Sequence, residues 1–391
     1  MKIVMLCDYY DEKCHYQENL FAKYYAKHGH DVTVIASTFN NAFEYISDRY
    51  DPTAPASEYR DGPVKVLKLP YSLNILNRLR KFGGVGEILE RERPHLIFSH
   101  DIHLNLAEAA RYKRRHPECR IIMDYHADYS NSAKNWLSLT VLHKGIRRAF
   151  LRRYRRAIDR IFPVVPASAS FLHEVYGVAY DEMDLLPLAA DIDLARATLQ
   201  EKSGEAVRRQ LGIPPEATVI FTGGKLSPVK RTHLLLEAVG SLAREHLHVL
   251  VVGDTGEAHA DYRRLMLDLV SGDARVHFIG WVDGDEVYRY MDACDFAVFP
   301  ASQSVLWQQA ISMGLPIIVG RTGVQDPQYM NLYGNVIILD EVDIRSSVIA
   351  ARIAELADDP ERVAELRVAA LRVAEELLNY HRQVPLTLGV A

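Results

Sequence analysis

Cysteine is scarce in this chain, which has four cysteines among 391 residues. They stand far apart, at Cys7, Cys14, Cys119 and Cys294, and no two have the CxxC spacing of a zinc or dithiol motif. The scatter also excludes the disulfide framework of a small secreted domain. Reduced thiols, and therefore a cytoplasmic protein, are predicted.

Long apolar runs are also absent. No stretch approaches the roughly 18 apolar residues of a membrane-spanning helix, and the first ten residues, MKIVMLCDYY, lack the order of a signal peptide and lead directly into a strand pattern. An excess of basic charge is missing as well, since the formal net charge is −5, which argues against nucleic acid as a partner. With 48% hydrophobic residues the chain is long enough for two globular domains.

Glycine is missing from the loop after the first strand, CDYYDEKCHYQEN. A nicotinamide-dependent oxidoreductase would need a GxGxxG turn at this place, so the sequence argues strongly against that class.

Strand and helix patterns alternate along the whole chain, which predicts parallel sheets covered by helices. Six strand patterns precede residue 169, and six more lie between residues 217 and 341. The two series are separated near residues 188–196. We therefore predict an α/β protein with two Rossmann-like domains that face one another across a cleft.

The segment FTGGKLSPVKRTHLLLEAV, residues 221–239, carries the clearest chemical signal. A strand pattern ends at Gly223 and Gly224, Lys225 and Lys230 follow, and a helix pattern comes next. Glycine lets the backbone approach a ligand closely, and a helix N-terminus offers free N–H groups. Together with two lysines, this arrangement predicts a site for a diphosphate.

Five segments, in order, resemble the GT-B glycosyltransferases and, among them, the retaining family 4: residues 29–37, 164–193, 222–238, 276–300 and 308–320. The resemblance implies that residues 1–192 bind the acceptor and residues 193–371 bind a nucleoside-diphosphate sugar. It also implies that residues 372–391 form a helix and tail returning to the N-terminal domain. The expected reaction moves a sugar to a glycan, lipid-linked or small-molecule acceptor, with retention and without a metal or other cofactor.

The donor-binding residues that the resemblance implies are Gly223, Gly224, Lys225, Lys230, Gly280, Trp281, Val282, Ser302, Gln303, Ser304, Val305 and Gln309. Gly280, Trp281 and Val282 form the turn expected to meet the base.

Two departures from the family pattern affect this expectation. The family usually has two glutamates eight positions apart, but Gln309 stands at the second position and no acid stands at the first, near Ala301. Ser302, Gln303 and Ser304 replace the usual glycine-phenylalanine-glycine. Glutamine can still hydrogen-bond a ribose, so the loss is one of negative charge beside the sugar.

His126 is the main catalytic candidate in the N-terminal half, with Asp128 beside it to orient the ring or bind acceptor hydroxyls. His126 follows the strand pattern RIIMDY, and ligands bind at the carboxyl ends of strands in open α/β sheets. It also falls where the family has a histidine that reaches the acceptor. Lys225 and Lys230 complete the catalytic set, and the acceptor-binding candidates are Tyr16, Gln17, Glu18, His100, Asp101 and Asn131.

No Asp-x-Asp motif on a loop offers a Mg²⁺ clamp; Asp191 and Asp193 have that spacing but are interpreted as a turn and helix cap. Two alternatives remain open. The first is a non-catalytic subunit that binds a sugar nucleotide. The second is an inverting GT-B enzyme with His126 or Asp128 as its base.

The stretch from Lys144 to Arg160 holds eight basic residues interleaved with apolar ones. It is typical of a solvated helix with a buried stripe, and it would also suit a surface that docks on anionic lipid. The second interpretation predicts a peripheral location at the inner face of a membrane.

Overall fold

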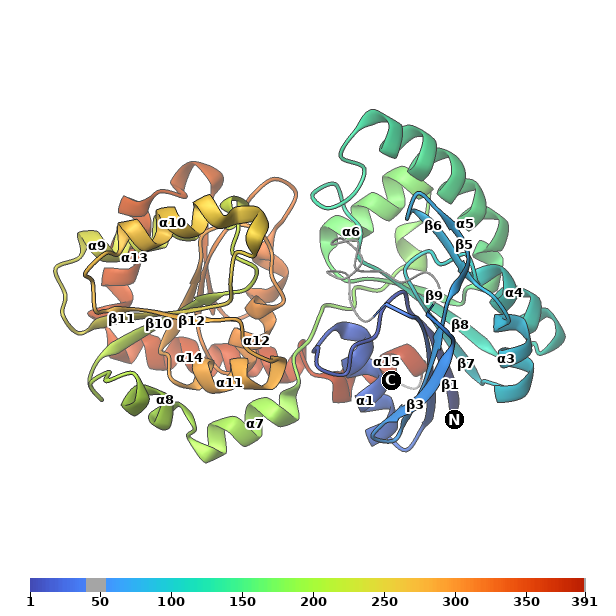
Figure 1. The fold of residues 1–391 in the computed structure, drawn as a ribbon, viewed down its shortest axis with the longest axis horizontal. Coiled ribbons are helices and arrows are strands. Elements are labelled where there is room, and N and C mark those ends of the chain that lie inside the picture. The colour runs from blue at the N-terminus through green and yellow to red at the C-terminus, as the bar shows by residue number, and fades with distance from the viewer. Residues whose placement is uncertain (40–53, 390–391) are drawn as a thin grey trace. The chain divides into compact units, whose positions relative to one another are not determined.

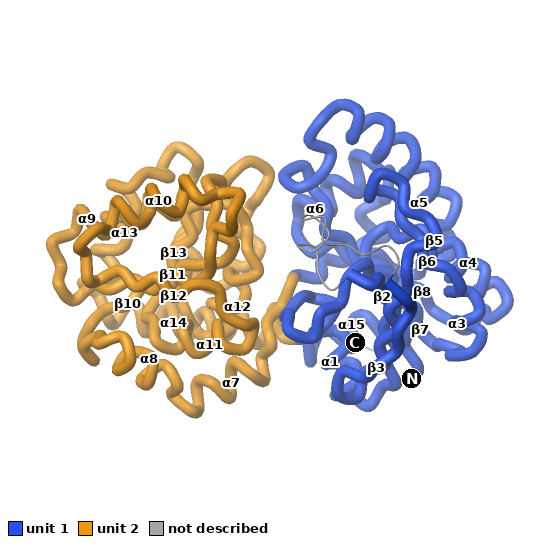
Figure 2. Tube along the Cα trace, viewed as in Figure 1, with its two compact units in different colours: residues 1–187, 380–391 blue, residues 188–379 orange. Residues whose placement is uncertain are grey.

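The computed structural model describes residues 1–39 and 54–389. The chain forms two compact units: Met1–Pro187 with Tyr380–Ala391, and Leu188–Asn379 (Figure 2). They are called unit 1 and unit 2 below. The first boundary therefore lies at 187/188 rather than 192/193, and the returning segment begins at Tyr380 rather than at residue 372.

Pairing between the two segments that connect unit 1 and unit 2 explains where these boundaries fall. The N–H of Ala190 donates to the carbonyl of Leu378 (3.3 Å), and Ala190 pairs with Asn379 in an isolated bridge. Both segments consequently belong to unit 2. The side chain of Asp191 accepts from the N–H of Leu194 (3.3 Å) at the start of a helix, which confirms its interpretation as a cap.

A seven-stranded sheet forms the centre of unit 1 (Figure 1), in the order β3-β4-β2-β1-β7-β8-β9. All neighbours are parallel except β3 and β4. The strands are β1 (Lys2–Leu6), β2 (Asp31–Ser37), β3 (Ser57–Asp61), β4 (Val64–Leu69), β7 (Leu96–His100), β8 (Arg120–Tyr125) and β9 (Arg160–Pro163). The six predicted strands are present, and β3 was not predicted because its sequence, SEYRD, is exposed and polar.

Helices cover both faces of this sheet. On one face, α1 (Gln17–Lys27) packs against α15 (Tyr380–Leu388), where the rings of Phe21 and Tyr380 lie 4.9 Å apart. This contact confirms that the C-terminal segment joins the N-terminal domain. The other helical elements in the described part of unit 1 are α3 (Val85–Glu92), α4 (Leu106–Arg115), the π-helix η1 (Ser138–Arg147), α5 (Arg148–Tyr154), the 3-10 turn η2 (Arg155–Ala157), α6 (Pro166–Phe171), the π-helix η3 (Leu172–Tyr176) and the 3-10 turn η4 (Tyr180–Glu182).

A short antiparallel hairpin, β5 (Tyr71–Ile75) and β6 (Leu79–Phe82), stands apart from the main sheet. Its turn uses Leu76 and Asn77 at positive φ angles of 51° and 55°. Sequence patterns did not predict it, because its residues are largely exposed and show no apolar alternation.

Unit 2 contains a six-stranded parallel sheet in the order β12-β11-β10-β13-β14-β15. The strands are β10 (Thr218–Gly223), β11 (Leu247–Val252), β12 (Val276–Gly280), β13 (Phe296–Phe299), β14 (Ile317–Gly320) and β15 (Val336–Leu339), as predicted. In Figure 1, α9 (Thr232–Ser241), α10 (Ala260–Leu269) and α13 (Ser346–Ala357) lie on one face. The other face carries α7 (Ile192–Glu201), α8 (Gly204–Gln210), α11 (Gly284–Asp292), α12 (Leu306–Ser312) and α14 (Pro360–Glu376).

After the link to unit 2 the chain forms two short helices, α7 and α8, separated at Lys202 and Ser203. Lys202 ends α7 with a left-handed φ of 51°. Gly204 then begins α8 against α11, and a Cβ atom at Gly204 would lie 2.3 Å from the backbone of Asp292. The close approach of these two helices explains the break.

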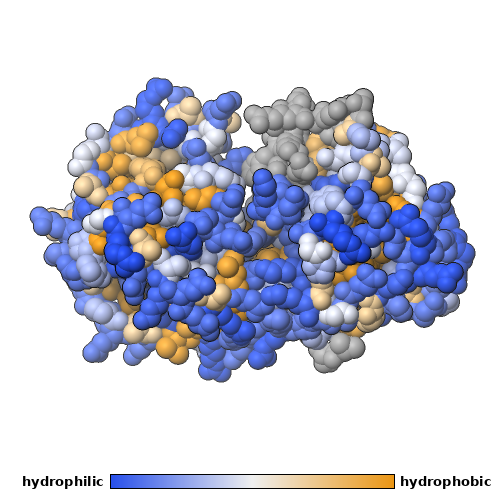
Figure 3. Space-filling model, turned by 60° about the horizontal axis from the view of Figure 1, so that its bottom comes forward, coloured by the Kyte–Doolittle hydropathy of each residue, from blue (hydrophilic) through white to orange (hydrophobic). Residues whose placement is uncertain are grey.

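Apolar side chains fill the space between sheets and helices, and the face seen in Figure 3 is mostly hydrophilic with small apolar groups. None of the helices within 1–39 and 54–389 has the length and apolar character needed to span a bilayer.

Candidate functional site

The loop after β10, where the sequence predicts a diphosphate site, is held by close backbone packing at the ends of β10 and β11. A Cβ atom on Gly223 would lie 2.2 Å from the carbonyl oxygen of Val252, and one on Gly253 would lie 2.0 Å from that of Gly224. Only glycine fits at both positions. Gly253 was not singled out from the sequence, although its place after the strand LHVLVV is the same signal that identified Gly223.

The expected base-binding turn joins the same framework. The N–H of Gly253 donates to the carbonyl of Gly280 (2.7 Å), and Gly280 has a left-handed φ of 82°. Trp281 follows as an exposed residue and Val282 as a half-buried one. The turn at Gly280 and the loop at Gly224 therefore lie at one edge of the sheet, as a bound nucleotide would require.

Lys230 is the more deeply placed of the two lysines. Its Nζ donates to the carbonyls of Ser302 (3.1 Å) and Gln303 (2.7 Å), and burial lowers its pKa to about 8. Lys225 is exposed on the same loop. The loop that follows β13 is thus attached to the loop that follows β10 through one ammonium group.

Residues 302–309 continue this loop into α12. Ser302 adopts a left-handed φ of 61°, and the Oγ of Ser304 accepts from the N–H of Leu306 (3.4 Å). Val305 caps α12, a helix of seven residues. Gln309 is only 4% exposed, and its Oε1 has no hydrogen-bond partner within the described part of the chain. A buried, unsatisfied amide oxygen is the feature expected where a ribose hydroxyl would donate.

In unit 1, two histidines share one buried carboxylate. Oδ2 of Asp124 lies 2.9 Å from Nδ1 of His100 and 3.2 Å from Nε2 of His126. Strand pairing creates the arrangement, because His100 at the end of β7 is in register with Asp124 of β8. The side chain of Asp124 is 1% exposed, whereas that of His126 is 26% exposed.

Electrostatic coupling favours the charged forms of Asp124 and His100. Burial opposes ionisation, but the two histidines hold the pKa of Asp124 well below its usual range. Burial likewise opposes protonation of His100, yet Asp124 and Glu18 raise its pKa well above the ordinary value. Because Nε2 of His126 faces the carboxylate, we assign the proton to Nε2, which leaves Nδ1 as an acceptor for a substrate hydroxyl.

Asp124, and not Asp128, is the carboxylate that contacts the ring of His126. Oδ1 of Asp128 accepts from the N–H groups of Ser130 (2.6 Å) and Asn131 (3.3 Å), so it closes the turn after His126. Asn131 completes that turn, since its amide donates to the carbonyl of His126 (3.0 Å). The prediction that Asp128 orients the ring of His126 is therefore wrong. Its buried carboxylate is directed at the backbone of the turn and not at the imidazole.

Asp101 links the two histidine-bearing strand ends. It has a φ of 60°, its N–H donates to Oδ1 of Asp124 (3.0 Å), and its own Oδ1 accepts from the N–H of His126 (3.3 Å). The sequence pointed to Asp101 as an acceptor contact. The structure shows that it positions His126 and Asp124 through the backbone.

The three residues at the start of α1 that are expected to contact the acceptor lie in different surroundings. Glu18 belongs to the histidine cluster, with Oε2 3.9 Å from Nε2 of His100, and burial raises its pKa. Gln17 is 5% exposed and neither of its amide atoms has a partner within residues 1–39 and 54–389. Tyr16 precedes the helix and is half-buried, and burial raises its pKa.

One group of side chains has the spacing of a metal site. His100, Asp124 and His126 each offer a ligand atom, and these atoms lie within 4.8 Å of one another. Whether the protein works without a metal, as the family resemblance implies, stays a prediction.

Comparisons with known proteins agree with this division of the chain. Residues 19–189 match the family model described as "Glycosyl transferase 4-like domain", and residues 216–359 match "Glycosyl transferases group 1". The chain belongs to the glycosyltransferases that these two models describe, since together they match most of its length. The family resemblance inferred from the five sequence segments is confirmed.

Two curated relatives are similar to part of the chain at low identity. It is 29% identical over 180 residues to "D-inositol 3-phosphate glycosyltransferase 2" of Catenulispora acidiphila, covering 43% of the chain and 41% of that protein. It is 26% identical over 239 residues to the D-inositol 3-phosphate glycosyltransferase of Thermomonospora curvata, covering 56% and 53%. The chain thus spans about half the length of the curated relatives it matches.

A solved structure extends the family fold to the whole chain. HepE of Anabaena, crystallised with UDP, has a TM-score of 0.70 at 18% identity, with all of both chains covered. This likeness shows the fold shared by the two proteins.

Proposed function

We propose that this family member transfers a sugar from a nucleoside diphosphate to a hydroxyl group of an acceptor. The observation that carries the proposal is the loop framework of unit 2, where Gly223, Gly224 and Lys230 converge with residues 302–304. HepE, which shares the fold, is described in complexes with UDP and UDP-glucose. A uridine nucleotide sugar is accordingly the first donor to test.

Charge stabilisation at the leaving diphosphate is the main contribution we assign to unit 2. Bond cleavage leaves an additional negative charge on the diphosphate, and a nearby ammonium group stabilises that charge more strongly in a buried site than in water. Lys230 is held in place by two carbonyls, so little reorganisation is needed. Lys225, on the exposed side of the loop, adds a second positive charge.

Unit 1 supplies the acceptor side in this proposal. Nδ1 of His126 accepts a hydrogen bond from the transferred sugar or the acceptor, while Asp124 fixes the ring through Nε2. The relatives are named for D-inositol 3-phosphate, so a small polar molecule is a candidate acceptor in addition to a glycan or a lipid-linked acceptor. The proposal includes retention of the donor's anomeric configuration. It also includes independence from metal, because the two lysines take the place of a metal clamp.

A donor screen in the presence of excess EDTA tests the proposal. We expect hydrolysis or transfer with at least one nucleotide sugar, undiminished by EDTA, and NMR of the product should show the donor's anomeric configuration retained. Loss of activity in EDTA that Mg²⁺ or Mn²⁺ restores would direct attention to the cluster of His100, Asp124 and His126.

The product also decides between the alternatives. Inversion would make His126 a general base. Nucleotide binding without turnover of any donor would favour a non-catalytic subunit, which the glutamine at position 309 would suit.

We also propose that unit 1 binds anionic membranes through the basic stretch from Lys144 to Arg160. Its charges are not equally available, because Arg155 pairs with Glu182 (2.8 Å) and Arg160 pairs with Asp184. Lys144, Arg152, Arg153 and Arg156 are exposed. The preceding residues supply exposed apolar side chains, Trp136 at 72% and Leu137 at 64%. Such a combination suits an interfacial helix.

Vesicle cosedimentation checks this proposal. Binding to phosphatidylserine vesicles should fall as ionic strength rises, because each basic residue near the surface contributes about 1 kcal/mol and is screened by salt. Replacing Lys144, Arg152, Arg153 and Arg156 by glutamine should abolish binding. The matched control changes Lys202, Arg209, Arg263 and Arg264, exposed residues of unit 2, and should retain it. Equal loss in both variants, or salt-independent binding, would contradict the assignment.

A further inference from the structure

A pocket in unit 1 adjoins the histidine cluster and is lined by three arginines. Arg78 and Arg80 come from the β5–β6 hairpin, and Arg147 comes from the end of η1. His100 lines the same pocket, and its ring centroid lies 4.5 Å from that of His126. The pocket is therefore next to the place where the proposed reaction occurs.

Arg80 is already neutralised. It forms an ion pair with Asp8, whose Oδ1 is also 3.5 Å from Nε2 of His103. A further N–H of Arg80 donates to the hydroxyl of Tyr9 (2.9 Å). Although burial opposes it, Arg80 helps to hold the pKa of Asp8 well below its usual range. These two charges form part of the wall and leave little net charge for a ligand.

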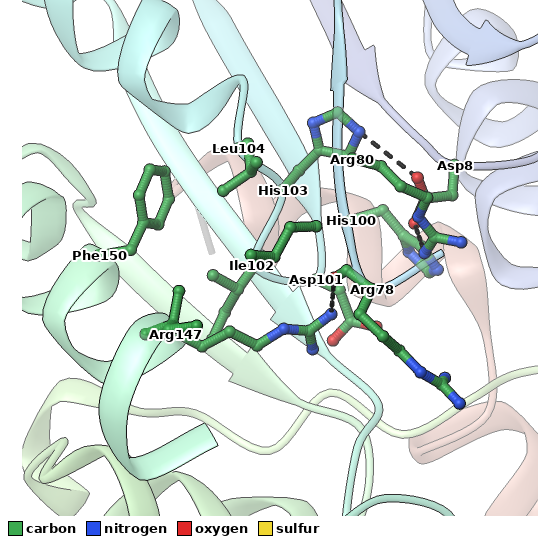
Figure 4. A pocket seen from close by; sticks show the side chains of 12 residues that line it. Asp8, Arg78, Arg80, His100, Asp101, Ile102, His103, Leu104, Arg147 and Phe150 are labelled. Carbon is green, nitrogen blue, oxygen red and sulfur yellow. Dashed lines mark hydrogen bonds and ion pairs between the residues drawn. The ribbon is translucent and has the colours of Figure 1, made fainter. Parts of the chain in front are cut away.

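Arg78 and Arg147 differ from Arg80 in their contacts. The Nη2 of Arg147 donates to the backbone carbonyl of Arg78 (2.9 Å), which fixes the hairpin to η1. Within residues 1–39 and 54–389 neither guanidinium forms an ion pair with a carboxylate. In Figure 4, Arg80 reaches Asp8, whereas the guanidinium groups of Arg78 and Arg147 lie apart from that pair. The pocket's other carboxylate, Asp101, accepts the N–H of His126.

A neighbouring histidine reports the positive potential of these two arginines. Burial lowers the pKa of His143 to about 4, and the charges of Arg147 and Arg78 lower it in the same direction. Nδ1 of His143 lies 2.7 Å from the hydroxyl of Tyr176. The charges of the exposed Arg78 and the half-buried Arg147 thus reach the same neighbouring side chain, and two adjacent guanidinium groups favour a bound anion.

We propose that Arg78 and Arg147 bind a phosphoryl group on the acceptor. The inference rests on the proposed function, because it assigns the acceptor to unit 1. Two guanidinium groups that have no carboxylate partner among the described residues match a phosphate dianion in charge and in planar donor geometry. Ile146 and Phe150 also line the pocket and would contact the carbon skeleton. The phosphoryl group belongs either to a free sugar or polyol phosphate or to a lipid headgroup.

Calorimetric binding of glycerol 3-phosphate, with glycerol as its uncharged partner, provides the test. The donor site is saturated with the nucleoside diphosphate that binds best, so that unit 2 contributes no phosphate binding. Arg147→Gln keeps a donor for the carbonyl of Arg78 but removes the charge, and Arg78→Gln removes the other charge. Arg111→Gln, an exposed position on α4, is the matched control.

Each pocket variant should weaken binding of the phosphate probe about tenfold or more, because hydrogen bonds to charged groups are worth more than neutral ones. Arg111→Gln should bind like the wild type, and all proteins should bind the nucleotide equally. Vesicles of phosphatidic acid, compared with phosphatidylcholine, form the lipid arm. Competition by these vesicles against the soluble probe would assign the phosphoryl group to a lipid, and its absence would assign it to a soluble acceptor.

Equal affinity for glycerol 3-phosphate in the wild type and both pocket variants would overturn the inference, as would equal affinity of the wild type for glycerol. The readout needs no turnover of donor. A protein that fails the donor screen but binds the probe through Arg78 and Arg147 would therefore disprove the proposed reaction and leave the anion site standing.

Discussion

Replacing Lys230 with alanine should lower turnover by about two to three orders of magnitude. A donor that stabilises charge developing in the transition state is typically worth about 2.7–4 kcal/mol. Lys230 is half-buried and its Nζ donates to the carbonyls of Ser302 and Gln303, so its charge is fixed at the loop that we assign to the diphosphate. Lys225→Ala should have an effect in the same direction. Steady-state kinetics with the best donor from the screen gives the measurement.

Because Lys230 also ties two loops together, its removal affects more than charge. Lys230→Met is the control for burial without charge, and Lys202→Ala, an exposed position of unit 2, is the control for surface charge. Thermal unfolding of each variant separates loss of fold from loss of catalysis. Turnover near that of the wild type in Lys225→Ala and in a folded Lys230→Ala would contradict the diphosphate assignment.

The pKa of Lys230 adds a pH dependence to the same prediction. Burial lowers it to about 8 in the free protein, and the protonated form is the one that stabilises phosphate. kcat/KM, which reports the free enzyme, should therefore fall as the pH rises through about 8. The arginine in Lys230→Arg keeps its charge at that pH, so the fall of kcat/KM in this variant should shift to higher pH.

The parallel sheets and the glycine loop after β10 could be predicted from the sequence because each has a local signal. Buried parallel strands read as continuous apolar runs, as in LHVLVV and FAVFP, and Gly223 and Gly224 end such a run directly before Lys225. The β3 strand and the β5–β6 hairpin lack that signal, since their side chains are mostly exposed. Their positions are set by pairing with β4 and by the turn at Leu76 and Asn77.

Asp124 shows what sequence patterns miss at the site. Within RIIMDY it occupies a strand position that looks like an isolated polar residue in an apolar run. Its role arises from register, because β8 places it beside His100 of β7, and from the turn that brings His126 back toward it. Asp128 looked like the better partner of His126 because it is close in sequence and follows the strand. The pocket arginines were missed for the same reason, since Arg78 and Arg147 are far apart along the chain.

Replacing His126 with alanine should depress sugar transfer by about two orders of magnitude or more, in the range of general acid–base or electrostatic contacts in active sites. Binding of the free nucleoside diphosphate should change little, because the residues assigned to it belong to unit 2 and His126 belongs to unit 1. Kinetics measures the first effect and calorimetric titration the second. A large loss of nucleotide affinity with unchanged transfer would contradict the assignment of His126 to the acceptor side.

Asp124→Asn tests how His126 is held. Asparagine keeps the size of the side chain but removes the charge that raises the pKa of His100, and an amide nitrogen facing His126 would favour the opposite tautomer. Transfer should fall less than in His126→Ala. The pH profile should also change, because His100 would lose its proton at a lower pH. If Asp124 served only packing, the asparagine variant would keep the pH profile of the wild type, and that result would remove the carboxylate from the proposed mechanism.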